Sequence, residues 1–133
     1  MTKKELSQLY YLNKEITAEK QRLAELEALA TNISSKISGL PHINELSDKT
    51  AIAAEIADVK AIIATKIRRS VTEYNKLNRY INSIDDSLIR LILRYRYIDH
   101  FSWNVTALKI GNGNSADSIR MIHTRFLKEE KLV

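Results

Sequence analysis

The chain has 133 residues, the size of one ordinary domain. Its 3 Gly, 1 Pro and absence of Cys favour long helices over a turn-rich β-fold, and they exclude disulfides, thiolate metal sites and cysteine nucleophiles. No run approaches 18 apolar residues and the first residues lead into no apolar segment, so we expect a soluble, cytoplasmic protein without a membrane span.

The positive charge of the chain lies in its second half. The formal net charge is +5. Residues 1–65 hold 8 Lys and Arg against 9 Asp and Glu, whereas residues 66–133 hold 13 against 7. A basic half is typical of proteins that bind an anionic partner there, with nucleic acid the first candidate. A solvated basic surface without a partner is the alternative.

A heptad pattern predicts a first long helix over residues 2–36. Apolar residues recur at steps of three and four, with Glu19 at the one missed position. The seam consists of Leu9, Leu12, Ile16, Leu23, Leu26, Ala30, Ile33 and Ile37. The segment Ser38-Gly39-Leu40-Pro41 is expected to end this helix, and Ser47 to cap the next one. Because the apolar residues keep a period of 3.5 residues, we expect this helix to pack against a coiled-coil partner.

A second long helix is predicted over residues 47–81, again from apolar residues at three- and four-residue spacing. These residues are Ile52, Ile56, Val59, Ile63, Ile67, Tyr74, Leu77, Ile81 and Ile84. The seam shifts where Lys66 and Ser70 occupy the regular positions. We therefore expect an antiparallel helical hairpin over residues 1–82, with its remaining apolar face covered by the C-terminal module or by a second subunit.

Three shorter helices are predicted over residues 83–98, 102–110 and 115–128. Ser83 and Asp86 fit a capping box. The neighbouring carboxylates of Asp85 and Asp86 are therefore interpreted as first-turn acids that favour the helix dipole, and not as acid–base catalysts. The fold class predicted for the whole chain is all-α, a long hairpin followed by a C-terminal helical module.

The last two predicted helices follow the plan of a helix-turn-helix within residues 83–133. Ala107 is small where the two helices should cross, and Gly111 lies where the first of them must stop. The side chains expected to face the core are Ile119, Ile122 and Phe126, with Trp103 as an anchor beneath both helices. Because the turn is about two residues longer than the tightest version, a generic helical hairpin stays open as an alternative.

The exposed face of the last predicted helix is the candidate DNA-binding surface. Side chains near the N-terminus of a recognition helix read base edges, while hydroxyls and cations hold phosphates. Arg120 is the predicted base contact, and an ion pair with Asp117 is its alternative. The full set of predicted DNA-binding residues is Lys109, Asn114, Ser115, Asp117, Ser118, Arg120, Met121, Thr124, Arg125 and Lys128.

Within this set, Ser115, Lys109 and Arg125 are the predicted phosphate contacts. For Arg125 the alternative is an internal ion pair with Asp85, Asp86 or Asp99.

The C-terminal half resembles region 4 of the sigma factors. The similarity is carried by Leu91 to Ile98, Phe101-Ser102-Trp103, the turn from Ala107 to Gly111, Ser118-Ile119-Arg120 and Arg125-Phe126-Leu127. The chain resembles in particular the small phage-encoded transcriptional regulators of Gram-positive bacteria, the ArpU/RinA-like late-gene activators. Lys36 to His42 and Ser47 to Lys49 also resemble a phage protein family of that kind. The resemblance implies binding of double-stranded DNA and, as a further expectation, contact with RNA polymerase in a bacterial host cell.

Three hypotheses of function follow. The leading one is a sequence-specific DNA-binding regulator whose hairpin forms a homodimer or holds polymerase. The second is a DNA-packaging protein of the small-terminase kind, and the third is a coiled-coil adaptor that binds only protein. His42, His100 and His123 have no metal-ligand spacing, and no nucleophile has a recognisable base partner. We therefore expect no metal, no cofactor and no enzymatic activity.

Overall fold

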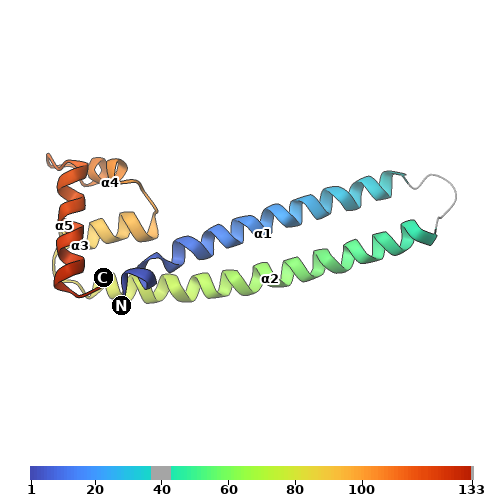
Figure 1. Cartoon of the computed structure of the whole chain (residues 1–133), viewed down its shortest axis with the longest axis horizontal. Coiled ribbons are helices and arrows are strands. Elements are labelled where there is room, and N and C mark those ends of the chain that lie inside the picture. Colours follow the sequence, from blue (N-terminus) through green and yellow to red (C-terminus); the bar gives the residue numbers. More distant parts are fainter. Residues whose placement is uncertain (37–42, 133) are drawn as a thin grey trace. The chain divides into compact units, whose positions relative to one another are not determined.

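The computed structural model describes residues 1–36 and 43–132, and the regular structure within those ranges is entirely helical (Figure 1). The elements in chain order are α1 (Lys3–Lys36), α2 (Ile43–Asn82), α3 (Ser87–Leu93), the π-helical turn η1 (Arg94–Ile98), α4 (Trp103–Ile110) and α5 (Ala116–Glu129). Helices α1 and α2 form a long antiparallel pair, and the shorter helices follow it. The predicted all-α class and order of elements are confirmed.

The chain divides into two compact units, and the division crosses both long helices. Unit 1 comprises Met1–Leu12 and Ser70–Val133, and unit 2 comprises Asn13–Arg69. This differs from the division between residues 82 and 83 that the sequence suggested. The reason is that the first turns of α1 and the last turns of α2 contribute apolar side chains to the core of the C-terminal helices.

The core of unit 1 has two clusters of buried side chains. The larger consists of Leu6, Leu9, Leu77, Ile81, Leu93, Tyr97, Phe126, Leu127 and Leu132. The smaller, formed by Ile92, Ala107 and Ile119, joins α3, α4 and α5. Near the chain ends, the backbone N–H of Lys3 donates to the carbonyl of Leu132 at 2.7 Å. The three C-terminal helices are thus packed around the first turns of α1 and the last turns of α2.

In unit 2, the polar interruptions of the two apolar seams meet each other. The ammonium group of Lys66 on α2 lies 3.7 Å from the carboxylate of Glu19 and 3.0 Å from that of Glu15, both on α1. Lys66 and Glu19 are both partly buried, whereas Leu26, Val59 and Ile63 form the apolar contact further along the pair. Because a shifted register would place either charge against an apolar side chain, this pairing favours one alignment of the helices.

Two predicted helix starts are wrong. Asp86, and not Ser83, is the N-cap of α3, and its Oδ1 accepts from the backbone N–H of Leu88 at 2.8 Å. The Ser83 hydroxyl instead donates to the carbonyl of Tyr80 in the last turn of α2, because carbonyls at a helix end have no partner within the helix. Helix α2 begins at Ile43, so Ser47 lies inside it. The predicted break at Ser38-Gly39-Leu40-Pro41 lies outside the described residues.

The helix predicted over residues 83–98 changes from α-helical to π-helical hydrogen bonding at Arg94. The backbone N–H of Asp99 donates to the carbonyl of Arg94 at 3.0 Å, a spacing of five residues. A wider turn of this kind adds one residue to the helix and rotates the side chains that follow. Here it brings Tyr97 into the larger core cluster of unit 1.

The core of unit 1 makes a prediction about stability. Leu93 on α3 is 0% exposed, so Leu93→Ala should lower the free energy of unfolding by about 2–5 kcal/mol, measured by urea denaturation. Leu91, two residues earlier on the same helix, is 39% exposed, and Leu91→Ala should cost about 0.5 kcal/mol or less. Equal losses in the two variants would contradict the described core.

Candidate nucleic-acid interface

Helices α4 and α5 have the capped starts and the sharp turn that a helix-turn-helix needs. The Ser102 hydroxyl accepts from the backbone N–H of Val105 at 3.2 Å, and the Ser115 hydroxyl accepts from that of Ser118 at 3.1 Å. Ala107 of α4 and Ile119 of α5 are buried in one cluster. The two helices therefore pack at the positions that the sequence indicated, and each begins at its predicted cap.

The turn between them is built from left-handed backbone. Gly111 has φ 69°, Asn112 has φ 55° and Gly113 has φ 75°, a conformation that Gly and Asn tolerate better than other residues. Asn114 closes the turn, because its side-chain amide donates to the carbonyl of Gly111 at 3.0 Å. This bond gives the predicted DNA contact Asn114 a structural role in the turn.

The buried face of α5 differs from the predicted stripe of Ile119, Ile122 and Phe126. Ile119 and Phe126 are buried as expected, but His123 is buried where Ile122 was expected, and Ile122 only borders the smaller core cluster. Leu127 completes the buried face. A histidine can occupy this position because the core offers it a polar partner.

That partner is Tyr97 of η1. Its hydroxyl lies 2.6 Å from Nε2 of His123, and the indole of Trp103 packs edge-on against the imidazole, with ring centroids 4.9 Å apart. Burial, with the nearby cations of Arg96 and Lys3, lowers the pKa of His123 to about 4. The ring is therefore neutral near pH 7, and it ties the middle of α5 to the preceding helical segment.

The outward face of α5 carries the charged and polar side chains of the predicted site. An open hollow of about 400 Å³ lies along this face, lined by Arg120, Met121, Thr124, Arg125 and Lys128. The guanidinium of Arg120 lies 2.6 Å from the carboxylate of Asp117, which is the alternative stated for Arg120. Because the two side chains are 57% and 82% exposed, this pair contributes at most about 1 kcal/mol and can exchange for another ligand.

The other predicted contacts have distinct surroundings. Among the ion pairs of the described chain none involves Arg125, so its pairing with Asp85, Asp86 or Asp99 is not formed. Lys109, exposed in the last turn of α4, has its ammonium 5.9 Å from the ring centre of Phe101. Ser118 is exposed one turn into α5.

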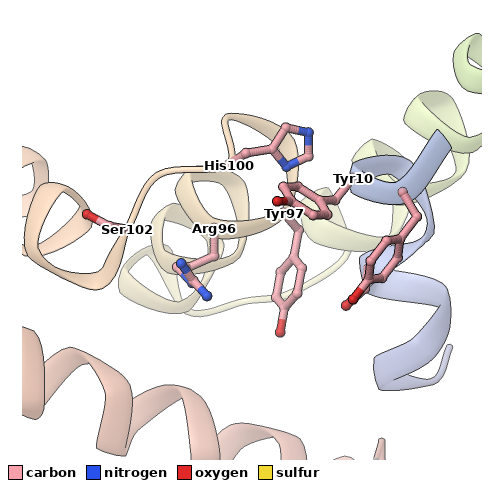
Figure 2. Close-up of a pocket in the computed structure, with 7 residues that line it drawn as sticks. Tyr10, Arg96, Tyr97, His100 and Ser102 are labelled. Carbon is pink, nitrogen blue, oxygen red and sulfur yellow. The ribbon is translucent and has the colours of Figure 1, made fainter. Parts of the chain in front are cut away.

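A second hollow in unit 1 was not predicted. It measures about 380 Å³ and is lined by Ser7, Tyr10, Tyr11, Arg96, Tyr97, His100 and Ser102 (Figure 2). Its one guanidinium, that of Arg96, donates to the carbonyl of Phe101 at 2.6 Å and lies 4.2 Å from the ring centre of Trp103. The cation is thereby engaged in holding the η1–α4 connection. Sequence spacing gave no signal for this hollow, because α1 and that connection are some ninety residues apart.

No family model matches the chain, and no curated protein or solved structure matches it either. Within residues 1–36 and 43–132, no helix combines the length and the apolar character that crossing a bilayer requires. The same part of the chain brings no three His, Cys, Asp or Glu side chains together in a group that could hold a metal ion.

The buried His123 makes stability depend on pH. Its pKa is about 4 in the folded chain and about 6.5 in an unfolded one, so between these values the unfolded chain binds more protons. Folding stability should therefore fall as the pH drops from 7 to 4, by up to about 3 kcal/mol from this residue. The control is His123→Gln, which cannot titrate. Chemical denaturation at several pH values should show the stability advantage of the wild type shrinking toward pH 4, whereas parallel curves would contradict the assignment.

Proposed function

We propose that the protein is a sequence-specific regulator that binds double-stranded DNA, with α5 as the recognition helix. The observation that carries the proposal is the exposed face of α5, which presents three cations beside a capped helix-turn-helix turn. Arg120, Arg125 and Lys128 lie together around one open hollow, and the exposed carboxylate of Asp117 pairs with Arg120. A helix that is buried on one face and cationic on the other suits a DNA groove.

Both helix starts add to this surface. Ser102 and Ser115 cap α4 and α5, and hydroxyls and free backbone N–H groups at helix starts are frequent phosphate contacts. Lys109 lies at the end of α4, just before the turn. These groups support contacts with the DNA backbone that would position the protein. The side chains in the middle of α5 remain to contact base edges.

The resemblance to phage-encoded regulators and to sigma-factor region 4 adds RNA polymerase as a proposed protein partner. Unit 2 supports a protein-binding role for the hairpin, because Leu29 on α1 and Ile62 on α2 are 47% and 42% exposed. Homodimerisation through the hairpin is the other proposed use of this surface. The assembly state in solution separates a regulator from a packaging protein: a monomer or dimer favours regulation, and a ring of eight or more subunits favours packaging.

Salt dependence tests the proposed surface. The full chain should bind duplex DNA with an affinity that falls steeply between about 50 and 200 mM salt, because bound cations release counterions from the phosphates. Arg125→Ala and Lys128→Ala should each reduce the slope of log affinity against log salt by about one. Fluorescence anisotropy titrations measure both quantities.

Lys20→Ala is the matched control, since this lysine is exposed on α1 in unit 2 and should leave the slope unchanged. No binding at 50 mM salt would favour the adaptor hypothesis. An unchanged slope in both α5 variants would indicate that DNA binds to another part of the protein.

Substitutions of Arg120 should distinguish a contact that reads a base from a contact that only binds a phosphate. Free of Asp117, its guanidinium can donate two hydrogen bonds to the O6 and N7 atoms of guanine, worth about 1–3 kcal/mol of discrimination. Arg120→Ala should weaken binding to a site selected from random DNA by that amount and relax the preference at one base pair. Arg120→Lys keeps the charge without the planar fork and should relax the same preference.

Arg125→Ala is the comparison variant, expected to weaken binding to selected and scrambled duplexes alike. The measurement is a pair of titrations, on the selected and the scrambled duplex, for each variant. Equal losses on both duplexes for Arg120→Ala would make Arg120 a phosphate contact, and no loss on either would remove it from the site.

A further inference from the structure

The exposed face of α5 has a central row and two flanks. Successive residues of an α-helix are about 100° apart, so Asp117, Met121, Thr124 and Lys128 form one row opposite the buried Ile119 and Phe126. On the same geometry, Arg120 and Arg125 lie on opposite sides of that row. The cations therefore border a strip whose middle two positions, Met121 and Thr124, carry no charge.

These two middle residues present apolar groups to solvent. Met121 is 62% exposed and lines the hollow that the three cations share. The hydroxyl of Thr124 donates to the carbonyl of Arg120 at 3.0 Å, so its proton is used within the helix and its γ-methyl group remains for an outside contact. An exposed thioether surrounded by Arg120, Arg125 and Lys128 fits an occupant that is anionic at its borders and apolar at its centre.

Duplex DNA offers this combination in its major groove. Phosphates line both edges of the groove, and the 5-methyl group of thymine is the apolar group that base edges present there. We propose that Met121, together with the γ-methyl of Thr124, contacts thymine methyl groups, so that α5 prefers sites with A·T pairs at the positions facing these residues. This inference rests on the proposed DNA-binding function and adds to it the base-pair class that the middle of the helix reads.

The test removes one methyl group at a time. A duplex selected by the full-length protein is synthesised with deoxyuridine in place of each thymine in turn, which deletes the 5-methyl group and keeps the base pairing. At one or two positions the wild-type protein should lose about fourfold in affinity, the effect of one buried methyl group. At the other thymines the affinity should be unchanged.

Protein variants then assign the contact. With Met121→Ala, the ratio of affinities for thymine and deoxyuridine duplexes should fall to about one at those positions. Leu108 is the matched control, because it is an apolar side chain on α4 with 80% exposure, and Leu108→Ala should keep the wild-type ratio. Both changes lie at exposed positions, and circular dichroism checks that each variant keeps its helical content.

The possible outcomes test the methyl contact and the DNA-binding function separately. Duplex binding that is insensitive to deoxyuridine at every thymine, or a selected site without thymine, overturns the methyl contact and leaves the DNA-binding function standing. A thymine preference that Met121→Ala retains assigns the methyl contact to another residue and also overturns the inference. Failure of the wild-type chain to bind any duplex at low salt would instead overturn the proposed function.

Discussion

The structure depends on one packing constraint, which is that the three C-terminal helices cannot bury their own apolar residues. Helices α3, α4 and α5 have 7, 8 and 14 residues, and helices of that length gain most of their stability from tertiary packing. Leu6 and Leu9 from α1 and Leu77 and Ile81 from α2 complete the core around Leu93 and Phe126. The two long helices are therefore structural parts of the module that carries the candidate DNA surface.

A polar contact inside this core fixes the orientation of α5. Apolar side chains alone would allow α5 to rotate by a fraction of a turn, since Ile122 and Leu127 lie on either side of the buried stripe. The hydrogen bond between Tyr97 and His123 is satisfied in one rotation, and leaving either group buried without a partner would cost about 1–3 kcal/mol. The π-helical turn η1 places Tyr97 opposite His123. The buried Tyr97–His123 pair therefore determines which side chains of α5 face outward.

The features that the sequence predicted are those set by neighbouring residues. The caps Ser102 and Ser115 and the Gly-rich turn act over a few residues, and the structure confirms them. The apolar seam of α2 is confirmed only in part, since Val59 is buried whereas Ile67 and Tyr74 are 41% and 37% exposed. The features that escaped prediction depend on residues far apart along the chain. His123 is buried because Tyr97, 26 residues earlier in the chain, lies opposite it. The cap of α3 is a local exception: Ser83 does not cap the helix because its hydroxyl donates to the carbonyl of Tyr80, three residues earlier. Lys66 interrupts its seam because Glu19 interrupts the other.

The same constraint decides how the proposed DNA-binding surface can be studied. A fragment of residues 83–133 would expose Leu93, Phe126 and Leu127, which the whole chain buries against α1 and α2. It would also lose the bond from the backbone N–H of Lys3 to the carbonyl of Leu132. Because the direction in which α5 presents Met121 and Arg120 is set by that core, weak DNA binding by such a fragment would report lost packing and would not identify a missing DNA contact. Substitutions at exposed positions of the full-length chain change the contacts of α5 and leave this core intact.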